Sequence, residues 1–81
     1  MQTEMIKLIW DFKGGDAAKI AEHHAIHLKE FAEKENLTLQ IAGSKTIDSL
    51  SAIAFLAVTR EEMPHVRDLL KPHRGELFMD N

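Results

Sequence analysis

The sequence predicts one small domain of the α+β class, and two observations support this fold class. Residues 16–36 repeat apolar side chains at the spacing of a helix with one buried side. The segments on either side contain short runs of β-branched, aromatic and alternating apolar residues, which are typical of strands. With 81 residues the chain is long enough for a single domain covering residues 1–81, so its hydrophobic core will be small.

The composition limits the kinds of function. The chain has 44% hydrophobic and 28% charged residues, as globular proteins do, and it contains no cysteine, which excludes disulfides and thiolate chemistry. Its formal net charge of -3 disfavours nucleic-acid binding. It lacks an apolar run of the roughly 20 residues that a membrane helix needs, and its first residues do not resemble a secretory signal. We therefore expect a cytoplasmic protein that does not contact a membrane.

The first strand is predicted at Met5–Phe12. Alternate side chains in this run point to the same face, and the set expected in the core is Ile6, Leu8, Trp10 and Phe12. Trp10 is interpreted as an anchor of that core rather than as a stacking platform. Gly14 and Gly15 are expected to form an ordinary turn, because no phosphate-binding motif follows them.

The long helix is predicted at Asp16–Asn36, with Asp16 as its N-cap and Asn36 in a left-handed conformation at its end. His24 lies within the apolar stripe, about 40° from the centre of the stripe at 100° per residue. We expect His24 to be a buried, neutral side chain that hydrogen-bonds a backbone carbonyl. A proton-transfer role is the alternative.

Two further strands are predicted between the helices. Leu37, Leu39 and Ile41 alternate with other residues, so the second strand is expected to begin there and to continue, bent at Gly43, to about Ile47. Residues 50–59 are apolar on both faces, as in a central strand. Their alanines leave a helix as the alternative, but their β-branched and aromatic residues favour the strand.

The second helix is predicted at Arg60–Lys71. Thr59 and Glu62 have the spacing of a capping box, whereas Pro64 would then fall inside the helix. We therefore expect an irregular first turn, a regular helix that begins within three residues of Pro64, and an end near Pro72.

A last short strand is predicted at Glu76–Met79 after Gly75, which completes the order strand, helix, strand, strand, helix, strand. This is the βαββαβ arrangement of the ferredoxin-like class, with a four-stranded antiparallel sheet of order 4-1-3-2 and two helices on one face. The sequence indicates no family within that class, since it lacks the cysteine pair of heavy-metal-transfer domains and the aromatic residues of RNA-binding sheets. The class by itself indicates no activity.

Three residues on one side of the long helix are candidate metal ligands: His23, His27 and Glu30. Their spacings of four and three residues bring them to the same side of a helix. Two features argue against a high-affinity site: only two histidines are present there, and Lys34 would compete for the carboxylate and repel a cation. We therefore expect an ordinary solvated helix face and a protein without a cofactor.

Four residues near the end of the second helix form the main cationic concentration of the chain: Arg67, Lys71, His73 and Arg74. Positive charge near a helix C-terminus is favoured by the helix dipole, and this explains the cluster without a ligand. The alternative is a binding site for an anionic small molecule or an acidic partner segment.

The function expected from these features is that of a small non-enzymatic interaction or regulatory module. Helices would cover only one face of the sheet, and the third strand is apolar on both sides, so the other face would expose Phe55 or Leu56 beside Ile9. We expect a homodimer joined through that face. The alternative is a small metal-binding protein or enzyme that uses the histidine-bearing side of the long helix, with His24 as a catalytic candidate.

Overall fold

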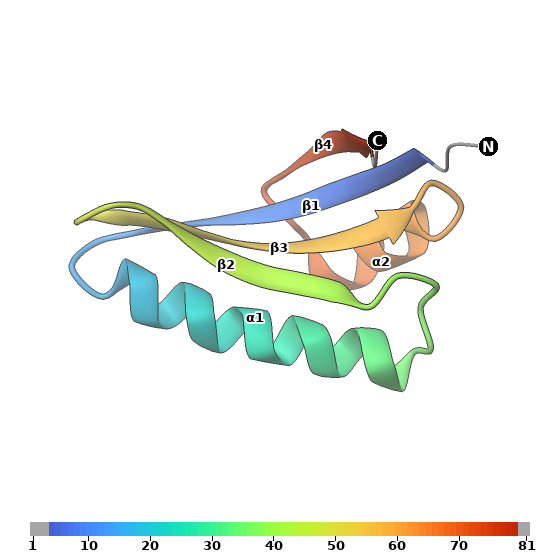
Figure 1. Cartoon of the computed structure of the whole chain (residues 1–81), viewed down its shortest axis with the longest axis horizontal. Helices are drawn as coiled ribbons and strands as arrows, with labels where there is room; N and C mark the ends of the chain where they lie inside the picture. The colour runs from blue at the N-terminus through green and yellow to red at the C-terminus, as the bar shows by residue number, and fades with distance from the viewer. Residues whose placement is uncertain (1–3, 80–81) are drawn as a thin grey trace.

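The structure, a computed structural model, describes the chain from residue 4 to residue 79 (Figure 1). Six elements follow one another: β1 (Glu4–Lys13), α1 (Ala17–Lys34), β2 (Ile41–Asp48), β3 (Ser51–Thr59), α2 (Met63–Leu70) and β4 (Arg74–Met79). This is the predicted order of strands and helices. The predicted α+β class is therefore confirmed.

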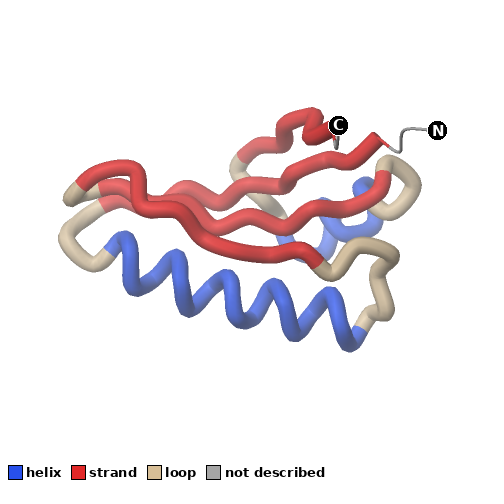
Figure 2. The backbone as a smooth tube through the Cα atoms, in the orientation of Figure 1, coloured by secondary structure: helices blue, strands red, loops and turns tan. Residues whose placement is uncertain are grey.

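The four strands form one antiparallel sheet in the order β2-β3-β1-β4, which is the predicted order counted from the other edge. Both helices lie on the same side of this sheet (Figure 1). The opposite face carries no helix within the described chain, as the tube in Figure 2 also shows. None of the described helices is long and apolar enough to cross a membrane.

The core lies between the sheet and the two helices. Alternate residues of the central strands point toward the helices and are buried: Leu8, Trp10, Ala52, Ala54, Leu56 and Val58. The helices contribute Ala17, Ala21, Leu28, Ala32 and Val66. Small and large side chains occur on both layers of this core, and alanines allow the backbones of the two layers to approach closely. The predicted core face of the first strand is therefore confirmed.

The second strand begins later than predicted. The alternating residues from Leu37 onward precede β2, which starts at Ile41. The N–H of Leu37 donates to the carbonyl of Ala32 at the end of α1 (2.9 Å), and the N–H of Thr38 donates to the carboxylate of Glu62 (3.0 Å). Because these donors are engaged elsewhere, the segment does not join the ladder with β3.

The later start also reverses the two faces of β2. Ala42 pairs with Leu56 and packs against the core, whereas Ile41 pairs with Ala57 on the helix-free face and is 44% exposed. The strand continues through Gly43 and has its register shift nearer its end. The alternation before Ile41 therefore predicted the wrong face, because that segment lies outside the sheet.

Both ends of α1 lie within two residues of the prediction. Asp16 occupies the N-cap position, but its side chain makes no capping hydrogen bond, so that part of the prediction is wrong. Instead, the carbonyl of Gly14 accepts from the N–H of Ala17 (3.1 Å) in a backbone turn. Gly14 has a φ of 111°, which glycine adopts readily. Asn36 has the predicted left-handed conformation, with a φ of 56°.

The start of α2 satisfies both the Thr59–Glu62 spacing and Pro64, whose signals conflict in the sequence. Oγ1 of Thr59 accepts from the N–H of Glu62 (3.2 Å), and the Glu62 carboxylate accepts from the Thr59 hydroxyl (3.0 Å). This box closes the turn before the helix, so α2 begins at Met63 and Pro64 falls in the first turn, where no backbone donor is needed. The helix therefore starts within three residues of Pro64, as predicted, and ends at Leu70.

Candidate ligand-binding site

A pocket of about 440 Å³ lies on the helix side of the sheet, between α2 and the edge strand β4. The sheet provides an apolar floor with Ile6, Leu8 and Leu77, and α2 provides a wall with Met63 and Arg67. Residues 72–74 close one end. This size and this mainly apolar lining are typical of sites for small molecules.

Gly75 keeps the floor of the pocket open. It pairs with Leu8, and an added Cβ would lie 3.6 Å from side-chain atoms of both Ile6 and Leu8, an ordinary contact distance. A larger side chain at this position would therefore fill the pocket. The sequence predicts Gly75 only as the residue before the last strand, but it lies within β4, where a glycine often marks such an opening.

Three of the four predicted anion-binding candidates line this pocket. They are Arg67, His73 and Arg74, whereas Lys71 does not line it. Lys71 ends α2 in a left-handed conformation, and its N–H donates to the carbonyl of Arg67 (2.9 Å). Nε of Arg67 lies 3.4 Å from the carboxylate of Asp68, and the Arg67 side chain is 54% exposed. Arg67 therefore brings a solvent-accessible positive charge to the pocket wall.

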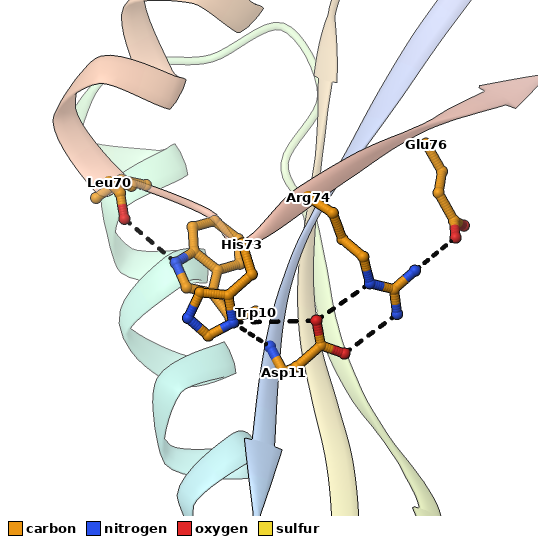
Figure 3. A network of polar contacts seen from close by, with 6 residues as sticks. All are labelled: Trp10, Asp11, Leu70, His73, Arg74 and Glu76. Carbon is orange, nitrogen blue, oxygen red and sulfur yellow. Dashed lines mark hydrogen bonds and ion pairs between the residues drawn. The ribbon is translucent and has the colours of Figure 1, made fainter.

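Arg74 is held by two carboxylates (Figure 3). Its Nε and Nη2 donate to the two carboxylate oxygens of Asp11 at 3.1 and 3.2 Å, and its Nη1 donates to Glu76 at 2.7 Å. The hydrogen bond from Arg74 lowers the pKa of Asp11 below its usual range. Because these contacts engage the Arg74 guanidinium, Arg67 is the better placed of the two arginines to bind an anion in the pocket.

The segment that closes the pocket is held against β1, as Figure 3 shows. The N–H of His73 donates to the carbonyl of Ile9 (2.9 Å), and the N–H of Asp11 donates to Nδ1 of His73 (2.8 Å). Nε1 of Trp10 donates to the carbonyl of Leu70 at the end of α2 (3.2 Å). Since Nδ1 of His73 accepts, its neutral ring carries the hydrogen on Nε2. Both α2 and the start of β4 are thus fixed to the same strand.

His24 lies half-buried between α1 and β1, on the side that its place in the apolar stripe predicts. Its ring packs edge to face against Trp10 and Phe12, with centroids 5.1 and 5.5 Å away. Nε2 does not make the predicted hydrogen bond to a carbonyl, because this atom is buried without a partner among the described residues. Burial lowers the pKa of His24, and the neighbouring histidines lower it further.

The three candidate metal ligands gather on the exposed side of α1, but Glu30 does not point where the histidines do. Nε2 of His23 and Nε2 of His27 are 3.0 Å apart. The carboxylate of Glu30 contacts the opposite ring nitrogen, Nδ1 of His27, at 3.3 Å. In the described part of the chain, no group of three His, Asp or Glu side chains is placed to hold a metal ion.

The residues predicted for self-association are divided between the two faces of the sheet. Leu56 points toward the helices and is fully buried in the core. Ile9 and Phe55 pair on the helix-free face, but Ile9 is only 1% exposed. The ring of Phe55 lies over Gly43, and Nζ of Lys7 is 4.6 Å from the centre of that ring. This face therefore presents a half-buried Phe55 to solvent, while Ile9 is covered.

Comparison with known proteins does not place the chain in a family, since no family model, curated protein or solved structure matches it. Its function is therefore inferred from its own pocket and surface residues.

Proposed function

We propose that this chain is a small non-enzymatic binding module of the ferredoxin-like class, whose pocket between α2 and β4 binds an apolar organic anion such as a medium-chain carboxylate. The βαββαβ order and the strand order of the sheet support the fold class. The pocket carries the functional proposal, because it joins an apolar floor to the accessible guanidinium of Arg67. Ligand sites commonly combine an apolar lining with a few polar groups that fix orientation.

The ligand would use the two parts of the pocket separately. Its hydrocarbon chain would contact Ile6, Leu8 and Met63, which would remove apolar surface from water. Its carboxylate would bind Arg67, whose planar guanidinium can donate two parallel hydrogen bonds to a carboxylate. Because Arg67 is more than half exposed, solvent weakens this contact, and we expect millimolar to submillimolar affinity for a ligand of about ten non-hydrogen atoms.

The lining favours binding over catalysis. It contains no serine, threonine, cysteine or lysine that could act as a nucleophile. Its carboxylate, Glu76, is engaged by Arg74, and Nδ1 of His73 accepts from a backbone N–H. Both of these polar groups therefore already have partners within the chain.

Octanoate and 1-octanol form a matched pair of probes for this site, because they share an apolar chain and differ in charge. Each is titrated into the labelled protein while backbone amide NMR signals are followed. We expect Arg67→Gln to weaken octanoate binding about fivefold and to leave octanol binding unchanged, since only the carboxylate uses that charge. Lys71→Gln removes the charge of a nearby residue that does not line the pocket, so it should change the binding of neither octanoate nor octanol.

The substitution Gly75→Leu tests whether the ligands bind in this pocket, and it changes no charge. The new side chain should fill the pocket and abolish binding of both probes while the chain stays folded, because its Cβ meets Ile6 and Leu8 at ordinary contact distance. The proposal fails if Gly75→Leu leaves octanoate binding intact. It also fails if Lys71→Gln weakens octanoate binding as much as Arg67→Gln does.

A second proposal is that the module self-associates weakly through the helix-free face of its sheet. The uncovered face and the half-buried ring of Phe55 favour it, together with Ile41, which is 44% exposed on the same face. The apolar area on offer is small, since Ile9, Ile53 and Ala57 are already buried within one chain. We therefore expect a weak homodimer rather than an obligate one.

A further inference from the structure

His23 and His27 direct their Nε2 atoms at each other on the exposed side of α1. These atoms are 3.0 Å apart, and the ring planes cross at 80°. The two residues are one helical turn apart, so the helix backbone fixes their spacing. At this distance the two rings share one hydrogen between them. The pair therefore places two possible nitrogen ligands within reach of one ion.

Glu30 lies beside the outer nitrogen of one ring. Its carboxylate is 3.3 Å from Nδ1 of His27, the ring nitrogen that does not face His23. The negative charge favours a hydrogen on this Nδ1, and in that tautomer Nε2 of His27 holds a lone pair and Nε2 of His23 donates the shared hydrogen. A carboxylate on the far ring nitrogen is the arrangement that metal-binding histidines usually have, because it fixes the tautomer and raises the basicity of the ligand.

We propose that Cu(II) binds between Nε2 of His23 and Nε2 of His27, with Glu30 as the outer carboxylate and water in the remaining coordination positions. The metal takes the place of the shared hydrogen, which His23 then carries on Nδ1. Imidazole is a preferred ligand of this ion, and Cu(II) stands highest in the affinity order of the divalent first-row metals.

The spacing of the two nitrogens suits one ion. Nitrogens bound at about 2.0 Å lie about 2.8 Å apart when they meet at a right angle, and about 3.3 Å apart at the tetrahedral angle. The distance of 3.0 Å falls between these values. Both exposed rings must still turn by about 35–45°, because each Nε2 faces the other nitrogen rather than an ion beside the line between them.

The affinity is expected to be moderate because the protein supplies only two ligands. No third His, Asp or Glu within the described chain is placed to join them. Lys34 follows Glu30 at i+4, and its positive charge opposes a cation there. We expect a dissociation constant on the order of tens of micromolar for Cu(II), with weaker binding of Ni(II) and Zn(II).

Copper titration of the whole chain, followed by calorimetry and by electron paramagnetic resonance, tests this site. We expect one ion per chain with spectral coupling to two nitrogens. His23→Ala and His27→Ala should each weaken binding at least tenfold, while His65→Ala, at an exposed position on α2, should not change it. The two α1 variants should stay folded, as circular dichroism would show, because alanine favours the helix more than histidine does.

The role of Glu30 is tested with a pair of substitutions that remove the same charge. Glu30→Gln should weaken copper binding about threefold, because it removes the negative charge beside Nδ1 of His27. Glu22→Gln removes an exposed carboxylate elsewhere on α1 and should have no such effect. The proposal is overturned if the His23→Ala variant binds copper as tightly as the unmodified chain, or if His65→Ala weakens copper binding as much as His23→Ala does. An electron paramagnetic resonance spectrum with coupling to a single nitrogen would also overturn it. If Glu30→Gln and Glu22→Gln changed the copper affinity equally, Glu30 would have no role in the site.

Discussion

Trp10 and His24 meet edge to face across the contact between β1 and α1, with their ring centroids 5.1 Å apart. The indole N–H of Trp10 donates to the carbonyl of Leu70, so this one side chain contacts both helices. His24, in contrast, buries its Nε2 without a hydrogen-bond partner among the described residues. Trp10 is thus firmly held in the core, whereas the buried Nε2 of His24 lacks a hydrogen bond and lowers the stability of the fold.

Replacing His24 by phenylalanine should stabilise the fold. The substitution keeps a ring against Trp10 and Phe12 and removes the buried, unpartnered nitrogen, so we expect a gain of about 1 kcal/mol in the free energy of unfolding at neutral pH. Urea unfolding of both proteins measures it. His65→Phe, at an exposed site, is the control and should change stability by less than about 0.5 kcal/mol. A destabilised His24→Phe variant would contradict the expected gain.

The same variant should alter the pH dependence of stability. Burial lowers the pKa of His24 in the folded state, so the unfolded chain binds the proton more readily. The folded state therefore loses stability as the pH falls through the unfolded value of about 6.5 toward the lower folded value. The advantage of His24→Phe over the unmodified protein should grow between about pH 8 and about pH 5. A difference that stays constant over this range would contradict a lowered pKa.

The Glu62 side chain holds the segment after α1 to the start of α2 through hydrogen bonds, so its removal should destabilise the fold. One carboxylate oxygen accepts from the N–H and the hydroxyl of Thr38 at 3.0 and 3.1 Å, and the other accepts from the hydroxyl of Thr59. We expect Glu62→Ala to lower the free energy of unfolding by about 1–2 kcal/mol, because it removes the hydrogen bonds to Thr38 and Thr59 that join these two segments. Glu61→Ala, at the neighbouring exposed position, is the matched control; an equal loss there would show that charge alone matters.

Glu62 should also contribute to acid unfolding. Burial raises its pKa, but the hydrogen bonds from Thr38 and Thr59 outweigh this, and the pKa lies below its ordinary value of 4.5. The stability that Glu62 supplies is therefore present above that value and is lost as the pH falls through the lower folded pKa. Glu62→Gln should be less stable at neutral pH and should lose less stability on acidification, which unfolding curves at several pH values measure. Parallel pH profiles of the two proteins would contradict this account.

The ion pair between Asp11 and Arg74 should contribute little. Both side chains are partly exposed, at 33% and 47%, and exposed pairs typically couple by less than about 1 kcal/mol. We expect a double-mutant cycle with Asp11→Asn and Arg74→Gln to give a coupling of about 0.5–1 kcal/mol that falls as salt is added. A coupling well above this range, or one that salt does not change, would indicate that Arg74 is more important to the fold than its exposure suggests.

The sequence correctly predicted the elements in which the spacing of apolar residues matches the side that is buried. Residues 5–12 alternate because β1 is central, and the apolar stripe of residues 16–36 is the side of α1 that meets the sheet. The proline near the start of α2 also marked the boundary of that helix correctly, since its missing donor restricts it to the first turn. In each case local chemistry and tertiary packing act in the same direction.

The errors arise where a distant residue determines the local structure. Leu37 and Thr38 look like the start of a strand, but Ala32 and Glu62 take their backbone donors. The pocket was not predicted because it depends on the pairing of Gly75 with Leu8, a contact between segments at opposite ends of the chain. Alternation and helical spacing contain no information on such pairings.

The last prediction concerns the helix-free face, where we expect weak self-association. Ile9→Glu would be a poor test, because Ile9 is 1% exposed and a buried carboxylate would unfold the chain. Ile41→Lys is better suited, since Ile41 is 44% exposed on that face, near Phe55. Ile26→Lys, at a 58% exposed position on α1, is the control that places the same charge away from the face.

Sedimentation equilibrium at tens to hundreds of micromolar should show partial dimerisation of the unmodified chain and of the Ile26→Lys variant. The Ile41→Lys variant should remain monomeric, because two lysines would face each other across a small apolar contact that cannot offset their repulsion and desolvation. A chain that is monomeric throughout this range would end the proposal of self-association. If only Ile26→Lys abolished the dimer, the contact would lie on the exposed side of α1 and not on the helix-free face of the sheet.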